Sequence, residues 1–81
     1  MVLDEFAIGV LRKMYFYGYI GGRHTSIDNL QKGFAKHDRG EVKDSVKELI
    51  KEGLVTPKKT GYGLHCSLNP NMIKEVEELI E

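Results

Sequence analysis

The chain has 81 residues, of which 41% are hydrophobic and 30% charged, a length that suits one domain with a single modest core. We therefore expect a single domain over residues 1–81. Its 12 basic and 12 acidic side chains give a formal net charge of zero, which argues against binding to nucleic acid through bulk charge but leaves room for a local basic patch.

The N-terminal part predicts one helix that ends in a cluster of large side chains. Apolar residues recur every three or four positions over residues 3–17, with Asp4 and Glu5 in the first turn and Gly18 suited to the left-handed position after the last turn. Five large side chains gather at its end: Met14, Tyr15, Phe16, Tyr17 and Tyr19. We expect most of these rings to pack against the core, with a partner-binding surface as the alternative.

A short strand and a second helix are expected next. Residues 23–25 are expected to lie on the edge of a later hairpin as a short strand. Ser26 suits the N-cap of a helix over residues 27–32, which Gly33 would end. Phe34, in the turn that follows, is expected to plug the core.

The third helix has the clearest pattern in the chain. Four apolar residues fall at i, i+4, i+7 and i+8: Val42, Val46, Leu49 and Ile50. This spacing predicts a helix over residues 39–52. Asp38 and Glu41 are expected to form a capping box at its start, and Gly53 suits its left-handed stop.

The exposed side of this helix carries both signs of charge. Four basic side chains recur at every fourth position: Arg39, Lys43, Lys47 and Lys51. Three acidic side chains lie near the centre of the exposed face: Glu41, Asp44 and Glu48. Basic residues are therefore expected to flank an acidic strip. Either these charges pair along a solvated helix, or the basic stripe meets phosphates.

A hairpin and a last helix complete the chain. Residues 54–68 predict a β-hairpin, in which a strand frays into a basic loop with Lys58 and Lys59, residues 60–63 form a Gly-rich turn, and residues 64–68 return. Residues 71–80 predict a last helix. It either closes the core against the first helix or forms a twofold contact between two copies of the chain.

Catalytic chemistry has little support in the sequence. The three histidines share no metal-ligand spacing with Cys66, which we expect to be a small buried hydrophobe. His65 and Cys66 would point to opposite faces of a strand, so they do not form a catalytic pair. We expect no enzyme activity, no catalytic residue, no metal and no cofactor.

Polar residues are dense in two stretches that the fold could bring together. Arg23 and His24 precede the second helix, and His37 and Arg39 precede the third. If the short strand lies near the start of the third helix, these four side chains converge on an anion. The alternative is that they cap helices and satisfy the backbone of turns.

Cysteine content and hydropathy indicate the compartment. The single cysteine excludes an intrachain disulfide framework and fits a reducing environment. No apolar run approaches the roughly 20 residues that span a bilayer, and the start of the chain is acidic where a signal peptide would be basic. We expect a cytoplasmic protein with no membrane contact.

Four stretches carry a resemblance to a known family: GGRHTS at residues 21–26, KGFAKHDRGEVK at 32–43, TGYG at 60–63 and SLNP at 67–70. Along nearly its whole length the chain resembles winged-helix domains, and it is similar in particular to small stand-alone archaeal winged-helix proteins of unassigned function. The resemblance implies an α+β fold with a three-helix core, a small antiparallel sheet with a β-hairpin wing, and an extra C-terminal helix.

The resemblance also implies a function. Winged helices typically bind double-stranded DNA through the third helix and the wing, so the family suggests a small transcriptional regulator. Eight residues would meet the DNA: Lys36, His37, Arg39, Lys43, Lys47, Lys58, Lys59 and Tyr62. Members of the fold also serve as protein-interaction or RNA-binding modules, and both alternatives stay open.

Overall fold

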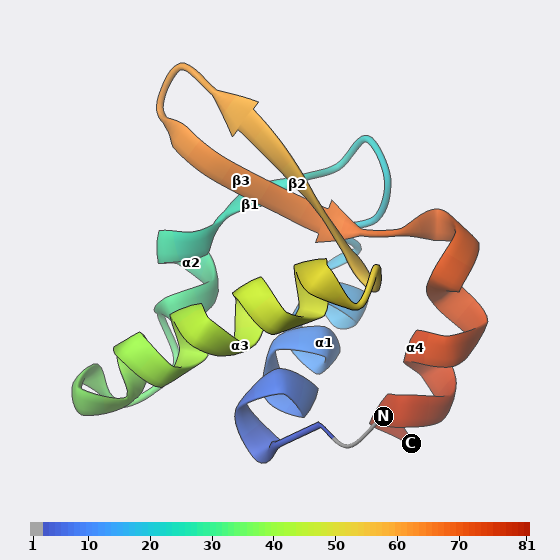
Figure 1. Cartoon of the computed structure of the whole chain (residues 1–81), viewed down its shortest axis with the longest axis horizontal. Helices are drawn as coiled ribbons and strands as arrows, with labels where there is room; N and C mark the ends of the chain where they lie inside the picture. Colours follow the sequence, from blue (N-terminus) through green and yellow to red (C-terminus); the bar gives the residue numbers. More distant parts are fainter. Residues whose placement is uncertain (1–2) are drawn as a thin grey trace.

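The computed structural model describes residues 3–81, which form four α-helices and one three-stranded antiparallel sheet (Figure 1). The helices are α1 (Glu5–Tyr17), α2 (Ile27–Gln31), α3 (Arg39–Lys51) and α4 (Ile73–Ile80). Two short 3-10 helices, η1 (Lys36–Asp38) and η2 (Pro70–Met72), precede α3 and α4. None of the helices in this range has the length and apolar character needed to cross a membrane. The expected α+β class is confirmed.

The sheet consists of β1 (Thr25–Ser26), β2 (Val55–Thr60) and β3 (Gly63–Leu68), in the order β1-β3-β2. The predicted edge strand is present, but it lies at Thr25–Ser26 rather than at residues 23–25. The expectation of a basic loop is wrong, because Lys58 and Lys59 pair with β3 and the turn holds only Gly61 and Tyr62. Pro57 is tolerated within β2 because this is an edge strand, where a missing N–H costs no ladder bond.

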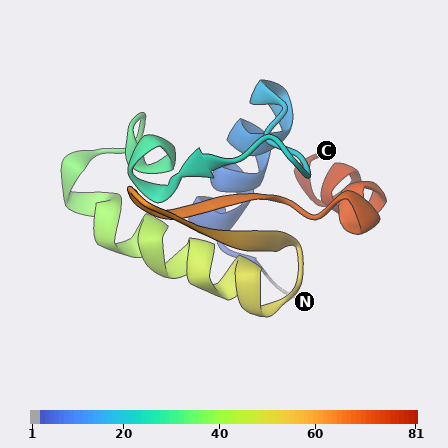
Figure 2. The same ribbon diagram turned by 90° about the horizontal axis from the view of Figure 1, so that it is seen from above.

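The core lies between the sheet, α1 and α3. α1 and α3 pack against each other beneath the sheet, and α4 covers α1 on the side away from α2 (Figures 1 and 2). The four helices and β3 all contribute to the fully buried core. Ten of its side chains are Val10, Leu11, Met14, Leu30, Val42, Val46, Leu49, Cys66, Leu68 and Val76. The apolar spacing of the predicted helices is therefore the spacing of the observed core. Phe34 also packs partly buried against this core, as expected.

Glycines end the two long helices as predicted. Gly53 has φ +80°, its N–H donates to the Ile50 carbonyl at 3.0 Å, and the N–H of Leu54 donates to the Leu49 carbonyl at 3.1 Å. Gly18 has φ +72° and closes α1 in the same way. This pair of hydrogen bonds is the Schellman motif, which satisfies carbonyls that the helix itself leaves free.

The predicted start of α1 and the predicted cap of α3 need correction, although α3 begins at Arg39 as expected. α1 begins at Glu5, because Asp4 is its N-cap and accepts a hydrogen bond from the N–H of Ala7 at 2.8 Å. The predicted capping box at Asp38 is wrong, because η1 runs straight into α3 and leaves Asp38 in a helical conformation, with no capping hydrogen bond from its side chain. An N-cap needs an extended backbone. Ser26 has one, and it caps α2 as predicted.

The C-terminal helix closes the core. Asn69 caps the η2 turn, which becomes α-helical only at Ile73, later than the predicted start at residue 71. Val76 is fully buried, and the Tyr15 hydroxyl donates a hydrogen bond to the Glu77 carboxylate. This hydrogen bond raises the pKa of Tyr15 above its usual value. The alternative in which the last helix closes the core against the first is confirmed.

The aromatic cluster at the end of α1 is only partly in the core. Met14 is fully buried and Tyr15 and Tyr19 are half-buried, but Phe16 is 79% exposed and Tyr17 is 61% exposed. Phe16 lies two positions after Met14 and so points away from the core, since successive residues turn by about 100° around a helix. Tyr17 is the last residue of the helix, and its ring stacks on that of Tyr19. The expectation that most of the rings pack inward is corrected at these two positions.

Candidate functional site

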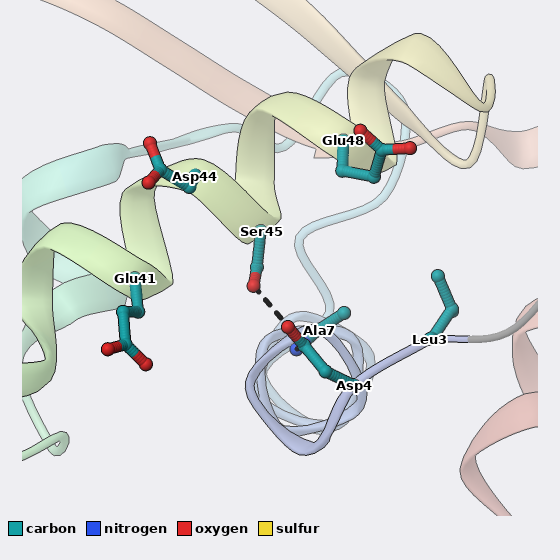
Figure 3. A pocket seen from close by; sticks show the side chains of 7 residues that line it. All are labelled: Leu3, Asp4, Ala7, Glu41, Asp44, Ser45 and Glu48. Carbon is teal, nitrogen blue, oxygen red and sulfur yellow. Dashed lines mark hydrogen bonds between the residues drawn. The ribbon is translucent and has the colours of Figure 1, made fainter.

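The charges of α3 are separated onto two flanks of the helix. Lys43 lines a hollow together with Tyr62 and Leu64 of the β2–β3 hairpin. Glu41, Asp44 and Glu48 instead line a hollow beside the start of α1 (Figure 3). By helical spacing Arg39 and Lys47 lie on the flank of Lys43, which we call the basic flank. The sequence pattern predicts basic residues on both sides of the acidic strip. In the structure, Arg39, Lys43 and Lys47 all lie on one side of it.

The hollow on the basic flank has a volume of about 330 Å³ and is shared by α2, α3 and the hairpin. In both views of the ribbon the tip of the hairpin lies on the side of α2, and the view from above places it between α2 and α3 (Figures 1 and 2). Eight residues line it: Ser26, Ile27, Asp28, Gln31, Lys43, Tyr62, Gly63 and Leu64. The sequence-predicted residues Lys43 and Tyr62 are thus brought together.

The hollow on the acidic flank has a volume of about 370 Å³. Its carboxylates come from two elements, because Asp4 precedes α1 while Glu41, Asp44 and Glu48 belong to α3 (Figure 3). The Ser45 hydroxyl, buried between the helices, donates a hydrogen bond to Asp4 Oδ1 at 3.3 Å. Within residues 3–81 no group of three or more His, Cys, Asp or Glu side chains is placed to hold a metal ion. This flank presents negative charge and would repel a phosphate.

The two lysines of β2 point to opposite faces of the hairpin. Lys59 pairs with Leu64, which lines the hollow on the basic flank, whereas Lys58 pairs with His65. Directly paired residues share a face, and successive residues of a strand alternate. Lys59 therefore belongs to the side of the basic flank, and Lys58 belongs to the outer face of the sheet.

Tyr62 is the most prominent side chain of the hairpin tip, with 98% of its surface exposed. The backbone beneath it is held by Thr60, whose hydroxyl accepts a hydrogen bond from the N–H of Tyr62 at 3.1 Å and donates one to the carbonyl of Gly63 at 2.8 Å. The turn is thus ordered while the ring stands in solvent.

The remaining predicted site residues are exposed along the start of α3. Lys36 and His37 lie in η1, where the imidazole of His37 is 3.4 Å from the Asp38 carboxylate. Gln31 of α2 donates a hydrogen bond to the carbonyl of Arg39 at 2.9 Å, which ties the two helices together at this end. Arg39, one turn before Lys43, is therefore fixed at its backbone and exposed at its side chain.

A histidine pair on the outer face of the sheet was not anticipated. His24 Nδ1 and His65 Nδ1 are 2.9 Å apart, and the ring centroids are 4.9 Å apart. Burial, followed by the charges of Lys58 and His65, lowers the pKa of His24 below its usual value. The alternative that Arg23, His24, His37 and Arg39 converge on one anion is not met by the two histidines, because His24 contacts His65 and His37 contacts Asp38. The strand register pairs His65 with Ser26, so the contact between the two histidines is a diagonal one that no local sequence signal indicates.

Cys66 is fully buried on the inner face of β3, as expected for a small hydrophobe. Burial raises the pKa of its thiol to about 11. A thiol in this state is protonated at neutral pH and is a poor nucleophile.

Comparisons of the chain with protein-family models, with curated proteins and with solved structures give no match. The function is therefore inferred from the arrangement of α2, α3 and the hairpin, and from the separation of basic and acidic side chains onto two flanks of α3. Predicted site residues from separate elements, Lys43 of α3 and Tyr62 of the hairpin, meet at the hollow on the basic flank.

Proposed function

We propose that the chain is a winged-helix domain that binds double-stranded DNA, with α3 as the recognition helix and the β2–β3 hairpin as the wing, and that it acts as a small transcriptional regulator. One observation carries this proposal. Lys43 of α3 and Tyr62 of the hairpin line the same hollow, so the helix and the hairpin present side chains to one ligand from two sides.

The order of the elements supports the assignment of roles. α2 and α3 follow one another as a helix pair, and the hairpin follows α3 directly. In a helix-turn-helix the second helix of the pair enters the major groove, with its N-terminal residues nearest the bases. Arg39 and Lys43 occupy that position and are exposed.

The basic flank supplies the charge that DNA requires. Arg39, Lys43 and Lys47 are spaced at every turn of α3, and Lys59 faces the same side from the wing. Each ammonium or guanidinium group can neutralise one phosphate and release a counterion. Asp28 contributes a carboxylate on the α2 side of the hollow, so the phosphate backbone would follow α3 and β2.

The wing tip supplies an exposed aromatic ring. Tyr62 stands in solvent on a turn between two glycines, which leaves its surroundings open to a groove edge. Proteins that contact the minor groove commonly combine a basic group with an apolar one. Lys59 and Tyr62 would provide this combination.

Two neighbouring lysines give a matched test of the proposal. Lys59→Glu should weaken binding to a fluorescent duplex at least about tenfold, because it removes one phosphate contact and adds repulsion. Lys58→Glu should weaken binding much less, since Lys58 lies on the outer face. Both positions are exposed, so both variants should keep the thermal midpoint of the wild type. Equal affinities for the two variants and the wild type would remove the wing from the mechanism.

A second candidate function is a protein-interaction module without DNA affinity. The observation that favours it is the 79% exposure of Phe16 at the end of α1, on elements that take no part in the proposed DNA contact. This candidate predicts no salt-dependent affinity for duplex DNA. An RNA-binding module predicts tighter binding to RNA than to a duplex of equal length.

A further inference from the structure

Phe16 forms a ridge between two hollows on the side of the molecule built by α1 and α4. One hollow is lined by Phe16 together with Tyr15, Glu77, Ile80 and Glu81. The other is lined by Phe16 with Arg12, Lys13, Tyr17 and Phe34, along with two glycines. The ridge is therefore an apolar side chain with an open, partly apolar surface on both sides.

The ridge is not required by the core of a single chain. Phe16 is 79% exposed, and its described aromatic contact is an edge-to-face approach to Tyr15 with ring centroids 6.0 Å apart. Exposing a whole phenyl ring is unfavourable in water, and burying it would gain from the hydrophobic effect. Tyr17, 61% exposed, and Phe34 line the same hollow as Phe16, so the three rings form one contiguous apolar surface, which marks an interaction site.

The two hollows carry opposite charge. Glu77 and Glu81 make one hollow acidic, whereas Arg12 and Lys13 make the other basic. Both basic groups also donate within the chain, Arg12 Nε to the Ile80 carbonyl at 3.2 Å and Lys13 Nζ to the carbonyls of Asn29 and Lys32, and they keep their positive charge at the surface. A surface with an acidic half and a basic half on either side of an apolar ridge is complementary to itself when it is rotated by 180°. The same surface would leave half of its charges unmatched against a uniformly acidic or a uniformly basic partner.

We propose that this surface, formed by Phe16 and the two hollows beside it, binds a second copy of the chain in a twofold dimer. The Phe16 rings of the two copies would pack together at the axis. The basic hollow of each copy would face the acidic hollow of the other. The twofold axis would therefore create two equivalent contacts, each between Arg12 of one copy and Glu81 of the other. The ridge comes from α1 and only one wall comes from α4, which places the contact beside the C-terminal helix rather than along it.

This dimer does not depend on DNA binding, because its residues belong to α1, α4 and the turn after α2. α3 and the wing stay free in both copies. A failure of the DNA experiments would leave the dimer untouched, and a monomeric protein would leave the DNA contact untouched.

Sedimentation equilibrium tests the ridge. The wild-type protein should dimerise, and Phe16→Ser should raise the dimer dissociation constant at least about tenfold. Tyr62→Ser is the matched control, since it removes an aromatic ring that is 98% exposed at the wing tip, and it should leave the dissociation constant unchanged. A wild-type chain that stays monomeric up to about 1 mM, or a Phe16→Ser variant that dimerises as well as the wild type, would overturn the proposal.

A charge exchange tests the twofold arrangement. Arg12→Glu and Glu81→Arg should each weaken self-association, because each homodimer would then place like charges opposite one another twice. An equimolar mixture of the two variants should dimerise like the wild type, since both contacts between unlike copies again join opposite charges. Interactions within one chain cannot produce this recovery. A mixture that associates no better than either variant alone would rule out the proposed pairing.

Discussion

The contact between His24 and His65 joins β3 to the segment that leads into β1. With the two Nδ1 atoms 2.9 Å apart, one ring donates a proton and the other accepts it. Lys58 is paired with His65 on the same face of the sheet, so a positive charge is already present. Adding a proton to the neutral pair makes one ring an imidazolium. This places a positive charge beside that of Lys58, which is unfavourable.

Stability should consequently fall in mild acid. The pKa of His24 is lowered from 6.5 in the folded chain, so the unfolded chain binds more protons below that pH. The contribution of His24 is complete above about pH 6.5 and is lost as the pH falls through its folded pKa. Urea midpoints measured at pH 7.5 and pH 5.5 should differ, in a range that leaves most carboxylates ionised (pKa about 4).

Two substitutions, one at the half-buried His24 and one at the exposed His37, separate the acid sensitivity due to His24 from that of other titrating groups. His24→Asn should remove most of the midpoint difference between the two pH values, because it removes the titrating ring. His37→Gln serves as the control, since this side chain is 85% exposed and lies outside the pair. A midpoint difference that survives His24→Asn would assign the acid sensitivity to another group.

At the scale of the elements, the two glycine stops define how long the main helices are. Gly53 ends α3 with φ +80°, in the left-handed region, and directs the chain into β2. An added Cβ would meet no atom within 4 Å there, so steric contact with neighbours does not contribute. The preference for glycine at this position is due to the backbone alone.

Two glycine-to-alanine substitutions should have opposite effects for this reason. Gly53→Ala should destabilise the chain by about 1 kcal/mol, because alanine in the left-handed region is strained. Gly40→Ala should stabilise it by about 0.5–1 kcal/mol, since Gly40 lies inside α3 with open space around it and alanine lowers the entropy of the unfolded chain. Urea unfolding of both variants checks the signs. A destabilised Gly40→Ala variant or a neutral Gly53→Ala variant would contradict this account.

The elements also show which features sequence patterns can predict. The apolar spacing of Val42, Val46 and Leu49 and the position of Gly53 are local signals, and α3 and its stop lie where these signals predict them. Asp38 misleads because the same residue types serve as an N-cap and inside a 3-10 turn, and only the backbone conformation distinguishes the two. The strand position of Lys58 and Lys59 depends on pairing with β3, which is a non-local contact.

For the whole molecule, the net charge is zero, but acidic and basic side chains lie on different sides of α3. Glu41, Asp44 and Glu48 face the start of α1, whereas Lys43 faces the hairpin. The sequence alone gives the angle between these residues around α3 but not the neighbour that each flank faces. Tertiary packing decides this, and it turns a chain without net charge into one with a usable basic side.

The most direct test of the proposed DNA contact is a salt titration of binding to a fluorescent random-sequence duplex, with single-stranded RNA alongside. A nonspecific dissociation constant of about 10⁻⁴ to 10⁻⁶ M is expected at physiological salt. The proposal assigns one phosphate contact to each of four exposed side chains, Arg39, Lys43, Lys47 and Lys59, so affinity should fall about 100-fold between about 50 and 200 mM salt. Lys59→Glu should reduce the salt slope by about one. No detectable binding at the lowest salt, or tighter binding to RNA than to the duplex, would contradict the DNA-binding function.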